Sequence, residues 1–159
     1  MKRIWLFLIA ACWMTLANAQ SLLPTTWTAY GLTFDAPRGI LVEEDTEDTY
    51  LLNNSRFYIS LHSLDSDNIV EGDLKELLKG LADDDNIQEQ TGLTSLDLKQ
   101  FHCFYLKGRV EEDACCYACF MTKDAGSVFC LSIIYQQADD KLIEKMLKSF
   151  KMEIGRAHV

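Results

Sequence analysis

The stretch Phe101–Tyr135, which reads FHCFYLKGRVEEDACCYACFMTKDAGSVFCLSIIY, decides the fold. Two groups of polar turn residues divide it into three runs that are rich in apolar and aromatic residues. Runs of this kind, joined by short turns, are typical of consecutive antiparallel strands. The stretch also holds every cysteine of the chain apart from Cys12. We therefore predict three neighbouring strands, against which the rest of the domain packs.

Further strands are predicted on the N-terminal side of this stretch. Asn53–Ser55 is predicted to join two of them in a hairpin, because Asn and Ser accept the backbone angles of tight turns. Pro37 and Gly39 indicate an earlier turn, and the acidic run Glu43–Asp48 is expected to be an exposed loop or hairpin tip. We expect residues 21–26 to be a loosely held lead. The predicted strands cover residues 27–34, 40–42, 49–52 and 56–64.

Two segments have apolar residues at helical spacing instead. The first is predicted to end near Asp83, because acidic residues at the end of a helix oppose its dipole. The second begins with Asp139 and Asp140 and has lysines late, which complements the dipole. Their apolar residues are Val70, Leu74, Leu77, Leu78 and Leu81, and Leu142, Ile143, Met146, Leu147 and Phe150. The order of elements predicts one α+β domain over residues 20–153, an antiparallel sheet with helices packed against it.

The N-terminal residues 1–19 have the three parts of a secretory signal peptide: basic Lys2 and Arg3, a short apolar run and the small residues Ala17-Asn18-Ala19. Cleavage is expected before Gln20, with export to the periplasm or the outside of the cell. A lipid anchor at Cys12 is the less favoured alternative, because the apolar run before Cys12 is very short and continues beyond it. The apolar run is too short for a transmembrane segment.

The C-terminal residues 154–159, Ile-Gly-Arg-Ala-His-Val, coincide with a one-frame translation of a common sequencing adapter. We expect them to be an artefact of DNA assembly, and we assign no role to His158. Codons for these residues in genomic context would contradict this interpretation.

The cysteines of the central stretch could form several kinds of site. Cys116 and Cys119 form a Cys-x-x-Cys motif, but residues three apart in a strand point to opposite faces, which disfavours a redox motif. Cys115 and Cys119 share a face at about 13 Å, too far apart for one metal ion. A hairpin loop of two or four residues would place Cys119 opposite Cys130, where a disulfide can form, whereas a three-residue loop would not. An odd number of exported cysteines would leave at least one thiol unpaired.

The sequence also disfavours nucleic-acid binding and several kinds of catalytic site. The formal net charge of −9 disfavours nucleic-acid binding, because phosphate backbones repel an acidic domain. His102 and Cys103 are neighbours in a predicted strand and face opposite ways, whereas a pair of Cys103 with His62 stays open but is disfavoured. No phosphate loop, zinc-protease motif or serine-hydrolase motif is present. We predict no catalytic residues, no cofactor and no metal ligands.

The segment Tyr30–Gly39, YGLTFDAPRG, together with the closing Leu147-Lys148-Ser149-Phe150, resembles PsbP-like domains. These domains are α/β sandwiches found in small exported bacterial proteins. The resemblance implies the fold and a role in binding partners without catalysis. It does not involve the cysteines and carries over no functional residue.

We therefore predict an exported, non-catalytic domain that binds a protein, a peptide or another partner in the cell envelope. The sheet face opposite the helices, with Arg56, Tyr58 and Tyr117, is the expected contact surface. The alternative is a cysteine-based redox or metal-binding protein, and a hydrolase is a weaker third.

Overall fold

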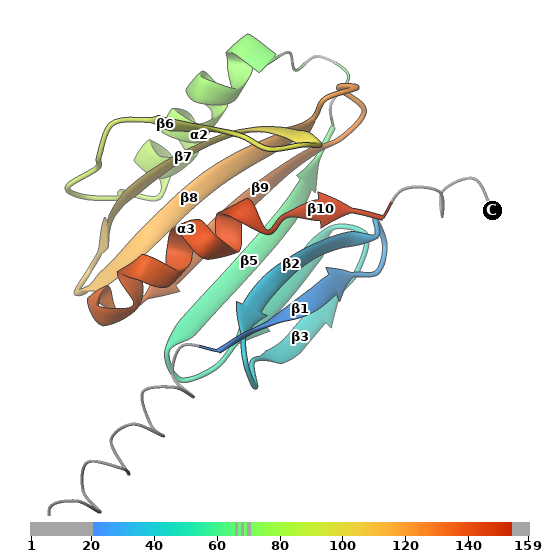
Figure 1. The fold of residues 1–159 in the computed structure, drawn as a ribbon. Helices are drawn as coiled ribbons and strands as arrows, with labels where there is room; N and C mark the ends of the chain where they lie inside the picture. Colours follow the sequence, from blue (N-terminus) through green and yellow to red (C-terminus); the bar gives the residue numbers. More distant parts are fainter. Residues whose placement is uncertain (1–20, 66, 68, 70, 154–159) are drawn as a thin grey trace, which may run out of the picture.

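The computed structural model describes residues 21–65, 67, 69 and 71–153. In this part of the chain a seven-stranded antiparallel sheet has the order β3-β4-β5-β9-β8-β7-β6, and a smaller sheet has the order β1-β2-β10 (Figure 1). The strands of the large sheet are β3 (Leu41–Asp45), β4 (Thr49–Asn53), β5 (Phe57–Leu64), β6 (Thr94–Asp97), β7 (Phe101–Val110), β8 (Asp113–Thr122) and β9 (Val128–Tyr135). The small sheet contains β1 (Leu22–Trp27), β2 (Leu32–Pro37) and β10 (Lys151–Met152).

The two α-helices of the described residues, α2 (Leu74–Asp84) and α3 (Asp140–Lys148), lie on opposite faces of the large sheet (Figure 1). Short 3₁₀ turns, Glu71–Asp73 and Gln137–Asp139, precede them. The predicted α+β fold, antiparallel sheet with packed helices, is confirmed. The three strands predicted in Phe101–Tyr135 are β7, β8 and β9, which are neighbours in the sheet.

Strand β8 is buried on both faces from Ala114 to Met121. On one face Phe120 packs in the larger core, which α3 and the small sheet cover. On the other face Tyr117 packs in a smaller core under α2. The run of apolar and small residues in β8 therefore reflects a strand between two layers, because neither face meets water.

Phe150, just after α3, links the two layers of the larger core. Its ring stacks on Phe34 of the small sheet at a centroid distance of 4.6 Å and on Phe120 of β8 at 4.3 Å. Aromatic pairs at such distances add to the free energy gained by burying the rings. The apolar stripe predicted for the last helix is the face that packs in this core.

The predicted lead at residues 21–26 is wrong, because this segment is strand β1. It pairs with β2 along its whole length, and its last residue, Trp27, is fully buried. The predicted strand at 27–34 is instead interrupted by a turn in which Gly31 has a φ of 64°, a conformation that favours glycine. Buried Trp27 donates a hydrogen bond from Nε1 to the carbonyl oxygen of Thr46 at 2.5 Å, which ties the acidic hairpin to this turn.

A close backbone approach at Gly108 of β7 fixes the connection after α2. A Cβ atom at Gly108 would lie 2.4 Å from Ile87 Cγ2 and 2.8 Å from the carbonyl oxygen of Gln88. Gln88 and Arg109 exchange two backbone hydrogen bonds of 2.8 Å at the same place. The absence of a side chain at Gly108 therefore lets this connection lie against β7.

We predict that Gly108→Ala destabilises the protein by about 1–3 kcal/mol, because the methyl group forces the Gln88 backbone away from β7. The matched control is Gly80→Ala in α2, where a Cβ meets nothing within 4 Å. Since alanine is the better helix former, the control should stabilise by roughly 0.5–1 kcal/mol. Urea unfolding of both variants measures the difference, and equal stabilities would contradict the close approach.

Candidate functional site

Helix α2 covers only part of its side of the large sheet. It packs against β7 and β8, whereas β3, β4 and β5 extend beyond it (Figure 1). The alternation of buried and exposed side chains along β5 shows that α2 does not cover this strand. Phe57, Ile59 and Leu61 are buried in the larger core, whereas Tyr58 and His62 on the α2 side are exposed. We call the uncovered area the open face and define it by Leu41, Leu51, Asn53, Tyr58, His62 and Ile134.

Strand pairing arranges the open face in rows that run across the sheet. The first row is Leu41, Asn53, Tyr58 and Ile134, each the register partner of the next. Leu41 is 68% exposed and Tyr58 is 43% exposed, which is high for large apolar or aromatic side chains. This row therefore presents apolar surface to the solvent at the β3 edge of the sheet.

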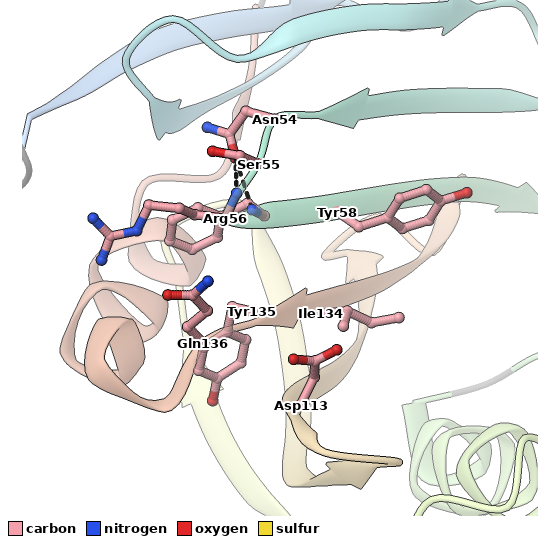
Figure 2. A pocket seen from close by; sticks show the side chains of 9 residues that line it. Asn54, Ser55, Arg56, Tyr58, Asp113, Ile134, Tyr135 and Gln136 are labelled. Carbon is pink, nitrogen blue, oxygen red and sulfur yellow. Dashed lines mark hydrogen bonds between the residues drawn. The ribbon is translucent and has the colours of Figure 1, made fainter.

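A shallow pocket of about 170 Å³ lies at the end of this row, beside the β4–β5 hairpin. Figure 2 shows Tyr58, Ile134 and Asp113 together on one side of it, whereas the guanidinium group of Arg56 points away from them. The pocket is lined by Asn54, Ser55, Arg56, Phe57, Tyr58, Asp113, Ile134, Tyr135 and Gln136.

Asn54 gives the hairpin at the pocket its shape. Its Oδ1 accepts hydrogen bonds from the backbone N–H groups of Arg56 at 2.8 Å and Phe57 at 2.7 Å (Figure 2). A side-chain amide that accepts from the backbone two and three residues later replaces the bonds of a tight turn. The hairpin predicted around Asn53–Ser55 is confirmed, and it fixes the start of β5 and therefore the position of Tyr58.

The positive charge of Arg56 is neutralised beneath the pocket. Arg56 Nη2 lies 2.6 Å from Asp139 Oδ1, and Arg56 Nε donates to Asp139 Oδ2 at 3.1 Å. The side chain of Asp139 is only 7% exposed. In contrast, no hydrogen bond or ion pair holds the exposed carboxylate of Asp113 within the described residues. The pocket therefore keeps a net negative charge.

A second ion pair holds the beginning of α3. Tyr135 donates a hydrogen bond to Asp140 Oδ1 at 2.5 Å, and Lys107 Nζ lies 3.1 Å from the same oxygen. Burial raises the pKa of Asp140, but the hydrogen bonds and the positive charge of Lys107 outweigh it and hold the pKa below its usual value. Burial and the same hydrogen bond raise the pKa of Tyr135.

The structure separates most of the cysteines, as the alternation of strand faces predicts. Cys116 packs in the larger core and Cys119 in the smaller one, so the Cys-x-x-Cys pair cannot meet across the sheet. Burial raises the pKa of Cys103 to about 12 and that of Cys115 to about 11, which keeps both thiols protonated. Cys103 and His62 lie on opposite faces, so this pair does not form a nucleophilic site.

Of the residues predicted for the contact surface, Tyr58 is exposed, whereas the prediction for Tyr117 is wrong because this side chain is buried. No sheet face lies opposite both helices, because α2 and α3 cover different faces. Tyr117 is buried under α2, and its hydroxyl donates a hydrogen bond to Asp85. In the described part of the chain, no group of three or more His, Cys, Asp or Glu side chains is placed to hold a metal ion.

The open face and the pocket lie within a segment that matches a known family. The family model described as dihydro-orotase-like matches residues 38–139, which span β3 to β9. The chain belongs to the dihydro-orotase-like family. A comparison with the curated proteins found no match.

Solved structures of other proteins share the fold of this dihydro-orotase-like chain. A Ran-binding protein, Mog1p of Saccharomyces cerevisiae, superposes with a TM-score of 0.60 at 10% identity, over 84% of this chain and 96% of that chain. A mutant of the protein Mog1 superposes with a TM-score of 0.59 at 9% identity, over 87% of this chain and 100% of that chain. At such identities the likeness concerns the fold.

These comparisons correct two predictions. The PsbP-like assignment is wrong, because the matching family is dihydro-orotase-like and the similar structures are Mog1 proteins. The predicted export to the periplasm or the outside of the cell is wrong as well, because the similar structures are of Mog1 proteins, one of them described as a Ran-binding protein. The predicted signal segment 1–19, the alternative anchor Cys12 and the tail 154–159 lie outside the described residues. Neither described α-helix has the length and apolar character that crossing a membrane requires.

We predict that Arg56→Ala destabilises the protein by about 1–3 kcal/mol, because it leaves the buried carboxylate of Asp139 without its partner. The matched control is Arg109→Ala, which breaks an ion pair with Glu89 whose side chains are 48% and 66% exposed. Exposed pairs contribute little, so this control should cost less than about 1 kcal/mol. Urea unfolding at neutral pH compares the two, and equal losses would contradict the role of burial.

The lowered pKa of Asp140 predicts a pH-dependent effect of Asp140→Asn. A carboxyl group whose pKa is lower in the folded state stabilises the fold above its unfolded pKa of about 3.9, and this contribution is lost as the pH falls through the folded value. The variant should therefore be less stable than the wild type at pH 7, and the difference should shrink below about pH 4. Unfolding curves at both pH values test this. Exposed Asp113→Asn is the control, and a difference for Asp140→Asn that stays constant with pH would contradict the prediction.

Proposed function

We propose that this protein is a non-catalytic binding module whose open face takes a protein segment that carries Lys or Arg beside an apolar side chain. The observation that carries this proposal is the exposed row of Leu41 and Tyr58 on an otherwise well-covered sheet. Exposed apolar residues that gather on one surface are a feature of protein interaction sites.

The charges around this row indicate which sign of charge the partner carries. Glu44 is the register partner of Leu51 and is exposed on the same face, and Asp113 lies beside Ile134 in the pocket. Neither carboxylate is in an ion pair within the described ranges. Arg56, the nearby cation, is already matched by Asp139. The surface is therefore complementary to a basic partner, which electrostatic attraction also brings in faster.

Binding fits the chemistry of the pocket better than catalysis does. Its titratable groups are Arg56, Tyr58, Asp113 and Tyr135, and carboxylates of the α3 segment hold Arg56 and Tyr135. Burial and the bond to Asp140 raise the pKa of Tyr135, so its hydroxyl stays protonated and is a poor base. Among the described residues that line the pocket, none would complete a catalytic pair with the exposed carboxylate of Asp113.

The fold relatives support a binding role, since a Ran-binding protein is built on the same scaffold. The chain itself disfavours nucleic acid, because its formal net charge is −9. The partner that we propose is consequently a protein segment, with basic residues for Glu44 and Asp113 and an apolar residue for the row of Leu41 and Tyr58.

The experiment is an NMR titration of the full chain with two synthetic peptides that have the same apolar residues and carry either Lys or Glu. The proposal expects the Lys peptide to bind and to shift signals of the open face, mainly Leu41, Tyr58 and Ile134. Equal binding of the Glu peptide, or shifts spread over both faces of the sheet, would overturn it. Self-association of the protein through this face, seen by sedimentation, would identify a second copy as the occupant and would also overturn it.

We predict that Tyr58→Ala weakens the Lys peptide by about tenfold or more, because exposed aromatic residues at interface centres dominate binding energy. The apolar control is Leu23→Ala on β1, where Leu23 is 45% exposed but belongs to the small sheet. Asp113→Lys should also weaken binding, whereas Asp84→Lys on the exposed surface of α2 should not. Unchanged affinity of Tyr58→Ala would remove the open face from the proposal.

A further inference from the structure

Cys119 of β8 and Cys130 of β9 are direct register partners. The loop between the strands has four residues, since Thr122 N–H donates to the carbonyl oxygen of Ser127 at 3.0 Å. Hydrogen-bonded and non-hydrogen-bonded pairs alternate along an antiparallel ladder. Counting from the bonded pair of Thr122 and Ser127 makes Cys119 and Cys130 a non-hydrogen-bonded pair, in which side chains come closest.

The two sulfur atoms already touch. Cys119 Sγ lies 3.3 Å from Cys130 Sγ. A non-hydrogen-bonded pair has a Cα separation of about 4.5 Å, which lies within the range of about 4.4–6.8 Å that a disulfide spans. A bond between the two sulfur atoms therefore needs a rotation of side chains and no movement of strands.

The other cysteines of the described residues have no such neighbour. Cys103 faces Phe120, Cys115 faces Gly108 and Ile134, and Cys116 faces Lys107 and Ile133. The contact between Cys119 and Cys130 is thus specific to one place in the sheet.

We propose that Cys119 and Cys130 form an oxidisable dithiol site that a peroxide converts to a cross-strand disulfide and a small dithiol or thiol reductant converts back. This site adjoins the open face at His62, but its chemistry does not require the partner proposed for that face. It differs from the Cys-x-x-Cys chemistry that the sequence suggests, because the pair joins two strands.

The reaction balances with hydrogen peroxide as the oxidant. The sulfur of Cys130 attacks one peroxide oxygen, the O–O bond breaks, and a sulfenic acid and one water are formed. The sulfur of Cys119 then attacks the sulfenic sulfur, the S–O bond breaks, and a second water leaves with the proton of Cys119. Two thiols lose two electrons in total, and the peroxide gains them.

The surroundings assign the order of these steps. Cys130 is 9% exposed, whereas Cys119 is fully buried under α2. The contact with Cys130 and burial raise the pKa of Cys119, so its thiol stays protonated until its partner has reacted. His62 is the register partner of Cys130 on the open side, so the oxidant approaches from β5. Cys130 is therefore the thiol that meets peroxide, and Cys119 resolves it.

The experiment treats the folded full chain with hydrogen peroxide, removes the excess, blocks remaining thiols with an alkylating agent under denaturing conditions and maps peptides by mass spectrometry. We expect loss of two alkylated thiols per chain and a cross-link between the tryptic peptides 110–123 and 124–141. Dithiothreitol should restore both thiols. Fragmentation of the linked peptide identifies Cys119 among the cysteines of the first peptide.

Variants separate the pair from general oxidation. Cys119→Ser should abolish the cross-link and leave Cys130 as a sulfenic acid that a dimedone-type probe labels, whereas Cys130→Ser should abolish both products. Cys115→Ser, on the same face of β8, should retain the cross-link. Retention of all thiols in the wild type, a cross-link through another cysteine, or an equal cross-link in Cys119→Ser would overturn the proposal. Because a serine variant can fold poorly, far-ultraviolet circular dichroism and the wild-type mapping accompany each measurement.

Discussion

The burial of β8 on both faces is the constraint on which the rest of the structure depends. A strand that has no face in water needs a cover on each side, and the chain supplies two different covers. On one side α3 and the small sheet carry Phe34 and Phe150 to Phe120. On the other side α2 covers Tyr117. The order of the sheet, with β8 flanked by β7 and β9, follows from the short turns that join these strands.

The burial of both faces of β8 also places its cysteines in two different cores. Because successive side chains of a strand point to opposite faces, Cys116 and Cys119 enter different cores although they stand close in sequence. A motif that looks like a redox pair along the chain is thus separated by the width of the sheet. The pair that the sheet does create, Cys119 with Cys130, consists of residues from two strands that the hairpin brings into register.

The open face results from the limited reach of the cover on the α2 side of the sheet. Helix α2 spans Leu74–Asp84 and reaches β7 and β8, whereas the sheet continues through β5 and β4 to β3. The uncovered strands keep large side chains such as Tyr58 and Leu41 in water. Covering such a surface with a partner removes apolar area from water and lowers the free energy. The carboxylates beside it, which are in no ion pair within the described residues, favour a partner of positive charge.

The fold class, the hairpins of Phe101–Tyr135, the apolar face of α3 and the separation of Cys116 from Cys119 could all be predicted from the amino-acid sequence. Each of these follows from local periodicity or turn chemistry, which a short window of residues contains. The tertiary structure decided that residues 22–27 form a strand, that the helices cover opposite faces and that Tyr117 is buried. The structure also shows that the loop between β8 and β9 has four residues, which places Cys130 opposite Cys119. These features depend on contacts between segments far apart in the chain, and no local pattern records which face another segment will cover.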